Sequence, residues 1–80
     1  MNMELKDFIS HFVEQFDDLD VSTINSETYF KEMDEWTSMA ALMIIGMIDE
    51  EYGVQISSKD IRGAETIADL FELVKSRKNV

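Results

Sequence analysis

The amino-acid sequence predicts an all-α domain: a four-helix bundle with three main helices, a short third helix and a long loop between the first two. Apolar residues recur at helical spacing near both ends of the chain. The 80 residues include no proline and only three glycines, so no flexible linker or repeat is visible. A chain of this length supports one domain with one modest core, so we assign residues 1–80 to a single domain.

The first predicted helix covers about residues 3–16. Its apolar residues follow the i, i+3, i+4, i+7 spacing that places side chains on one helix face. These residues are Leu5, Phe8, Ile9, Phe12, Val13 and Phe16. The opposite face is charged and polar, so the pattern predicts an amphipathic helix with its apolar stripe on the core.

Residues 17–37 form the predicted loop. This segment is rich in Asp, Ser, Thr and Asn, which favour turns and helix caps. It also contains large apolar residues, namely Leu19, Val21, Ile24, Tyr29, Phe30, Met33 and Trp36. Long loops are usually functional or disordered, and these apolar anchors indicate a loop that lies on the core.

The second predicted helix covers about residues 38–52. Thr37 or Ser38 can cap its first N–H groups, and Gly53 suits a left-handed helix end. The predicted inward stripe consists of Ala41, Ile44, Ile45, Ile48 and Tyr52. The other face is also apolar, with Met39, Ala40, Met43, Gly46 and Met47. A small domain cannot easily bury a helix on all sides, so we expect an exposed partner surface; cover by the loop or a homodimer is the alternative.

The last two helices are predicted at about residues 58–62 and 66–76. Ser57 or Ser58 can cap the short third helix, and Thr66 with Asp69 resembles a capping box for the last one. The predicted buried stripe of the last helix consists of Ile67, Leu70, Phe71 and Val74. Between helices two and three, Val54 and Ile56 are expected to return to the core.

Composition excludes several classes of function. The formal net charge of −10, from 17 acidic and 7 basic residues, argues against nucleic-acid binding. From charge alone, the acidity either favours basic partner surfaces or only keeps the domain soluble. The absence of cysteine excludes disulfides and thiolate zinc sites, and a single histidine, His11, excludes a His-rich metal site. This composition suits a reducing cytoplasm. We expect no signal peptide and no membrane insertion, because the longest apolar run, Met39 to Ile48, is far shorter than the ~20 residues that a spanning helix needs.

Four segments carry a resemblance to a known family: Thr37-Ser38-Met39, residues 29–33, residues 49–56 and residues 66–70. Through them the chain resembles the acyl and peptidyl carrier protein family over nearly its whole length. Thr37-Ser38-Met39 resembles the Asp-Ser-Leu attachment motif of that family, and residues 29–33 resemble the approach to the motif. Residues 49–56 resemble the acidic helix end with its apolar anchor, and residues 66–70 the opening of the last helix. The resemblance implies an acyl-carrier-like bundle.

The resemblance also implies a function. Ser38 would accept 4′-phosphopantetheine from coenzyme A by the action of a phosphopantetheinyl transferase, and the thiol of the arm would carry acyl groups as thioesters. Acyl-loading and acyl-processing enzymes, such as an acyl ligase or a ketosynthase, would be its partners in a fatty-acid, polyketide or related pathway. We expect a monomeric carrier with no catalytic residue and no metal. From position alone, Ser38 is either a helix cap or a phosphate attachment point.

The motif departs from the family pattern in ways that suggest a specialised carrier. Thr37 replaces the usual acidic residue, Met39 replaces leucine, and Ala40 and Met43 stand where fatty-acid carriers usually have carboxylates. We therefore predict docking through a methionine patch with an acidic rim. The predicted partner-facing residues are Thr37, Met39, Ala40, Met43, Met47, Asp34, Glu35 and Glu50.

Two other classes compete with the carrier. A small helical interaction module would use the Met-rich face without any role for Ser38. A calcium loop starting at Asp18, with Asp20 and Ser22, would require Gly and Glu where Thr23 and Tyr29 stand, which argues against it. A Ser–His–Asp catalytic set has no support, because nothing links His11 to Ser38.

Overall fold

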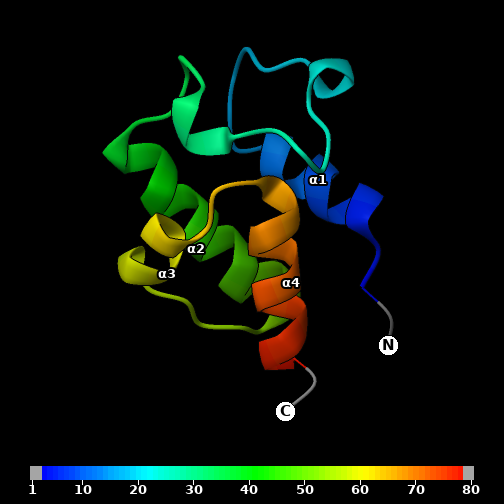
Figure 1. The fold of residues 1–80 in the computed structure, drawn as a ribbon, viewed down its shortest axis with the longest axis vertical. Helices are drawn as coiled ribbons and strands as arrows, with labels where there is room; N and C mark the ends of the chain where they lie inside the picture. Colours follow the sequence, from blue (N-terminus) through cyan, green and yellow to red (C-terminus); the bar gives the residue numbers. More distant parts are fainter. Residues whose placement is uncertain (1–2, 79–80) are drawn as a thin grey trace.

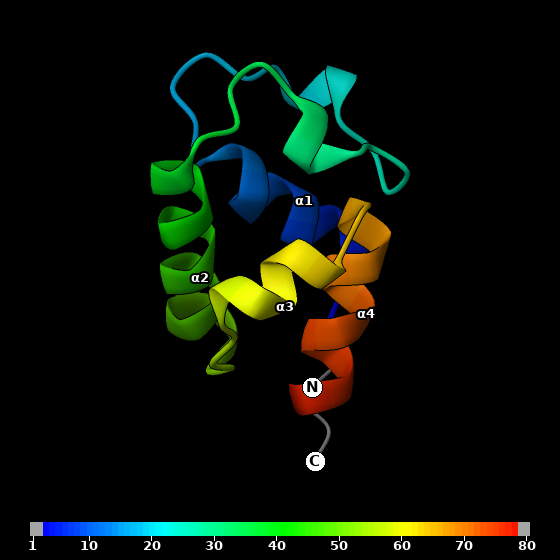
Figure 2. The ribbon, with the colours of Figure 1, turned by 60° about the vertical axis from the view of Figure 1, so that its left-hand side comes forward.

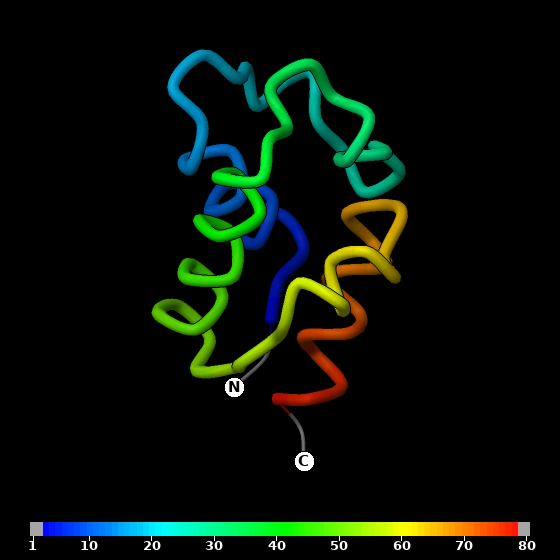
Figure 3. The backbone as a smooth tube through the Cα atoms, turned by 90° about the vertical axis from the view of Figure 1, so that its left-hand side faces the viewer, coloured from blue at the N-terminus to red at the C-terminus, as the bar shows by residue number. Residues whose placement is uncertain are grey.

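The computed structural model describes residues 3–78, which form four α-helices and two short 3₁₀ helices, with no strand in that range (Figure 1). The elements are α1 (Leu5–Val13), η1 (Val21–Thr23), η2 (Phe30–Glu32), α2 (Ser38–Tyr52), α3 (Ser58–Gly63) and α4 (Ile67–Lys78). α3 crosses between α2 and α4, and the long loop covers the end of the bundle where α2 and α4 begin (Figures 2 and 3). The predicted all-α fold is confirmed.

α1 is shorter than the predicted range of residues 3–16. The N–H groups of Gln15 and Phe16 bond to carbonyls three residues back, at 3.1 and 3.0 Å, so the chain tightens and leaves the α-helix after Val13. The Gln15 side chain also donates to the His11 carbonyl at 3.0 Å. The apolar stripe is confirmed, because Phe8, Phe12 and Val13 are buried and the rest of the stripe packs against the core.

Most of the predicted anchors hold the long loop on the core. Phe30 is fully buried, and Leu19, Ile24, Met33 and Trp36 pack against the core. The prediction is wrong for Val21 and Tyr29, which are about half exposed. Tyr29 immediately precedes Phe30, and the tight turn of η2 directs only the second of these two rings inward.

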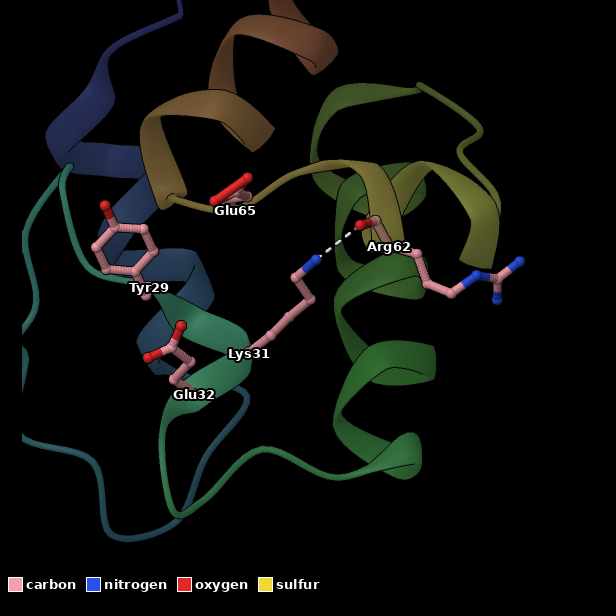
Figure 4. A pocket seen from close by; sticks show the side chains of 5 residues that line it. All are labelled: Tyr29, Lys31, Glu32, Arg62 and Glu65. Carbon is pink, nitrogen blue, oxygen red and sulfur yellow. Dashed lines mark hydrogen bonds between the residues drawn. The ribbon is translucent and has the colours of Figure 1, made fainter.

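Residues 26–31, which we call the loop strap, are held against α3 and α4 by main-chain hydrogen bonds and by the Lys31 side chain. The carbonyls of Ser26 and Thr28 accept hydrogen bonds from the N–H groups of Ala68 and Ile67, at 2.8 and 3.2 Å. At the end of α3, the Arg62 carbonyl accepts a 2.7 Å hydrogen bond from Lys31 Nζ (Figure 4). These bonds satisfy backbone groups that helix ends otherwise leave open.

The later helices begin at side-chain caps. Ser57, rather than Ser58, caps α3 and forms a capping box with Asp60. Arg77 of α4 binds the same carboxylate through both terminal nitrogens, at 2.7 and 2.9 Å. The Arg77 hydrogen bonds, followed by the Ser57 N–H, hold the pKa of Asp60 well below its usual range. Thr66 caps α4, so that helix begins one residue later than predicted.

The neighbouring helices determine which residues of α2 are buried. This helix contacts α1, α3 and α4. Ala40, Ile44, Met47 and Ile48 are buried, while Ala41, Ile45 and Tyr52 are partly buried against the same core. The predicted stripe of the last helix is confirmed, because Ile67, Leu70, Phe71 and Val74 are all buried. One face of α2 remains open to solvent.

Candidate functional site

Thr37 caps the N-terminal end of α2, and this cap determines where Ser38 lies in the helix. Its backbone is extended (φ −142°, ψ 172°), and its Oγ1 accepts a 3.1 Å hydrogen bond from the Ala40 N–H. Its carbonyl accepts from the Ala41 N–H at 3.1 Å. Thr37 is therefore the N-cap, and Ser38 is the first helical residue.

The Ser38 side chain is exposed, and no hydrogen bond among residues 3–78 involves its hydroxyl. Three other serine hydroxyls are engaged: Ser22 donates to Asp20, Ser57 to Asp60, and Ser76 to the Leu73 carbonyl. Within residues 3–78 the hydroxyls of Ser10, Ser26 and Ser58 make no hydrogen bond either, so Ser38 differs from these three by its position at the start of α2. Because Thr37 performs the capping, the simple cap interpretation of Ser38 does not apply. Its hydroxyl is accessible to an external reagent.

A hollow of about 310 Å³ lies beside Ser38, between the end of α1 and the start of α2. Its apolar lining comes from Phe16, Met39, Ala40 and Met43, and its polar lining from Gln15, Asp17, Asp18, Glu35 and Thr37. Both chain neighbours of Ser38 belong to this lining. The hollow therefore combines apolar and acidic lining residues beside the two chain neighbours of Ser38.

The electrostatics of this end of α2 combine two opposing effects. The N–H groups of Ser38 and Met39 lie in the first helical turn, where no intrahelical acceptor exists, and the helix dipole there favours a negative group. Asp17, Asp18 and Glu35 place carboxylates around the hollow, and none of its lining residues is basic. A phosphate here would depend on backbone groups, while the surrounding carboxylates would attract cationic protein surfaces.

The predicted partner-facing residues divide into two groups. Met39 and Met43 are 64% and 41% exposed, and the side chains of Thr37, Asp34, Glu35 and Glu50 are also exposed. The prediction is wrong for Ala40 and Met47, which are each only 5% exposed. Because three helices pack against α2, its buried arc is wide enough to include both residues.

Sequence reasoning missed Leu42, which is 62% exposed. The signal was present in the spacing, because Leu42 lies three residues after Met39 and four before Gly46 and so shares their helix face. The exposed apolar surface thus centres on Met39, Leu42 and Met43 rather than continuing along α2 to Met47.

His11 lies at the opposite end of α2 from Ser38. Its Nδ1 is 3.6 Å from a Glu14 carboxylate oxygen and its Nε2 is 3.7 Å from one of Glu51. Its ring also meets Tyr52 edge-on, with centroids 5.9 Å apart. Ser38 and Glu51 are separated by about 20 Å along the helix, so the imidazole cannot activate this hydroxyl.

The acidic residues of the loop have local structural roles. Asp20 caps η1 by accepting from the Ser22 N–H at 2.9 Å and the Ser22 hydroxyl at 2.8 Å. These bonds, the backbone one first, lower the pKa of the Asp20 carboxyl. Within the described range, no three His, Cys, Asp or Glu side chains are grouped so as to hold a metal ion.

None of the helices within residues 3–78 combines the length and apolar character that crossing a membrane requires. No protein-family model, curated protein or solved structure matches the chain.

Proposed function

We propose that this chain is an acyl carrier protein that holds acyl groups on a 4′-phosphopantetheine arm attached to Ser38. The observation that carries the proposal is the Ser38 hydroxyl, which is exposed and without a hydrogen-bond partner among residues 3–78, at the first position of α2. The motif Thr37-Ser38-Met39 and the whole-chain resemblance supply the chemical class. The small all-helical bundle is compatible with that class.

In the attachment reaction, Ser38 Oγ attacks the β-phosphorus of coenzyme A. The new Oγ–P bond forms as the pyrophosphate P–O bond breaks, which releases the adenosine bisphosphate. The hydroxyl proton leaves to a base of the transferase, because the only histidine of this chain lies at the other end of α2. The N-terminal end of α2 should stabilise the resulting negatively charged phosphodiester by about 0.3–1 kcal/mol.

The arm then carries the cargo. Its terminal thiol forms a thioester with an acyl group supplied by an acyl ligase or a ketosynthase-type enzyme of a fatty-acid, polyketide or related pathway. The domain itself supplies no catalytic group. The absence of cysteine from its sequence leaves the thiol of the arm as the sole thiol of the loaded protein, which suits a cytoplasmic location.

Intact-mass spectrometry tests the proposal. After incubation with coenzyme A and a broad-specificity phosphopantetheinyl transferase, the wild-type chain should gain the mass of one arm. Ser38→Ala should gain none. Ser58→Ala is the matched control, because Ser58 is the exposed first residue of α3, and it should be modified normally. An unmodified wild type, or a modified Ser38→Ala variant, would contradict the proposal.

A second candidate is a non-catalytic interaction module, favoured by the exposure of Met39, Leu42 and Met43. A module of this kind would bind its partner through that apolar surface with an unmodified Ser38. The same mass measurement separates the two candidates, because only a carrier gains the arm.

A further inference from the structure

Methionine is the only sulfur-containing residue of this chain, which has six methionines and no cysteine. Two of these methionines, Met39 and Met43, are 64% and 41% exposed, and both belong to α2. Met47 is only 5% exposed, and Met3 and Met33 are partly buried against the core. Among the methionines of residues 3–78, a dissolved oxidant therefore reaches Met39 and Met43 most readily.

Both exposed thioethers lie close to the Ser38 hydroxyl. Met39 directly follows Ser38, and Met43 comes four residues after Met39, so the two methionines share one helix face. Both also line the hollow of about 310 Å³ beside Ser38. An oxygen atom added to either sulfur would make this lining more polar next to the hydroxyl.

We infer that Met39 and Met43 form a peroxide-sensitive switch that controls the modification of Ser38. In each oxidation, the thioether sulfur attacks one oxygen of hydrogen peroxide. The S–O bond forms as the O–O bond breaks, and the second oxygen leaves as water after proton transfer. Sulfur is oxidised and the peroxide is reduced, and the product is a polar methionine sulfoxide that a sulfoxide reductase can convert back.

The switch rests on the proposed function of Ser38 and adds its regulation. A phosphopantetheinyl transferase that brings coenzyme A to the Ser38 hydroxyl must come close to the side chain of the next residue, Met39. An apolar thioether loses little when water is removed from it, whereas a sulfoxide oxygen loses its hydrogen bonds to water. The oxidised chain should therefore be a poorer substrate of the transferase.

Burial of the other methionine of α2 protects the fold during this oxidation. Met47 packs in the core, where a sulfoxide would be a buried polar group without a partner. Peroxide reaches Met47 only when the domain opens. Met39 and Met43 are exposed and can carry a sulfoxide in the folded state, so the switch acts without unfolding the domain.

The first measurement locates the oxidation. After graded treatment with hydrogen peroxide, tryptic digestion releases residues 32–59 as one peptide, and tandem mass spectrometry assigns the added oxygen atoms within it. Met39 and Met43 should be oxidised at least about tenfold faster than Met47. The double variant Met39→Leu/Met43→Leu should lose both fast sites. Met47→Leu is the matched control on the same helix, and it should keep them.

The second measurement tests the switch with a broad-specificity phosphopantetheinyl transferase and coenzyme A, after catalase has removed the peroxide. Oxidised wild type should show a KM for Ser38 modification about tenfold higher than untreated wild type. Its Tm should stay within about 4 °C. Treatment with sulfoxide reductases for both epimers should restore the KM. The double leucine variant should show the same KM, within about twofold, before and after peroxide.

The outcomes separate the switch from the carrier proposal. A wild type that accepts no arm would overturn both. A wild type that is modified with the same KM before and after oxidation of Met39 and Met43 would overturn the switch and leave the carrier intact. An equal rise of KM in the peroxide-treated double leucine variant would also overturn the switch, because the effect would then come from another residue. Oxidation of Met47 as fast as Met39 would overturn it as well.

Discussion

Phe30 should be the principal anchor of the loop that leads to Ser38. Its side chain is fully buried and lies edge-on to Trp36 and Phe12, with ring centroids 5.1 and 5.8 Å apart. Phe30→Leu removes three carbons and both aromatic contacts. At ~0.8 kcal/mol per buried carbon, the removal of three carbons alone corresponds to a loss of about 2–3 kcal/mol.

This loss is large relative to the total stability of the domain. A chain of 80 residues has a free energy of unfolding of about 4–12 kcal/mol. With an m-value of about 1–3 kcal/mol/M for urea, the unfolding midpoint should fall by roughly 1–2 M. The single tryptophan, Trp36, contacts the altered side chain, so its fluorescence reports the transition directly.

Tyr29→Leu is the matched control, because it removes a neighbouring ring that is 54% exposed. Its effect should stay within about 0.5 kcal/mol, as is usual for surface substitutions. Equal midpoints for the two variants would refute the reasoning, because the buried ring would then contribute no more than the exposed one.

Three further predictions concern other parts of the fold. Met47→Glu should unfold the domain or lower its Tm by more than about 10 °C, whereas Met43→Glu should leave the circular dichroism spectrum and Tm nearly unchanged, because only Met47 is buried. Gly53→Ala should cost about 1 kcal/mol in denaturant unfolding, because Gly53 has φ +66° at the end of α2. Asp60→Asn should lower the Tm at pH 7. Since Arg77 lowers the pKa of Asp60, the charged form stabilises the fold above about pH 4, and the difference from wild type should shrink toward pH 2; a constant difference would contradict this assignment.

The sequence predicted helix boundaries well where explicit signals mark them. α2 begins after a threonine cap and ends before a glycine in the left-handed conformation, and its predicted range matches the structure. α1 has neither signal, and an apolar stripe that continues to Phe16 led to a prediction that was too long. Periodicity shows which residues face the core, but it does not show where the backbone stops being helical.

The orientation of α2 could be predicted only in part. A helix with apolar residues all round its surface carries little periodic information, so its buried face is decided by the neighbours it meets. Contacts with three helices bury Ala40 and Met47, which had been assigned to the outer face. The position of Ser38 was predictable, because the cap at Thr37 and the attachment-like motif indicate the same helix start.

The loop strap was not predictable from side chains, because its contacts to α4 run through backbone carbonyls. Ser26 and Thr28 contribute main-chain oxygens, and those bonds do not depend on which side chains stand at the two positions. Among the described residues, Lys31 is the one side chain that bonds the strap to α3 or α4. Nothing in the local sequence pattern identifies the Arg62 carbonyl as its acceptor.

The loop strap also affects hydrogen exchange at the start of α4. The N–H groups of Ile67 and Ala68 belong to the first helical turn, where a helix offers no acceptor of its own. Their only backbone hydrogen-bond acceptors in the described structure are the carbonyls of residues 28 and 26, about half the chain away, so we expect slow deuterium uptake there to depend on these bonds. Deuterium uptake at these two amides therefore reports release of the loop strap from α4, and it can be followed without a label.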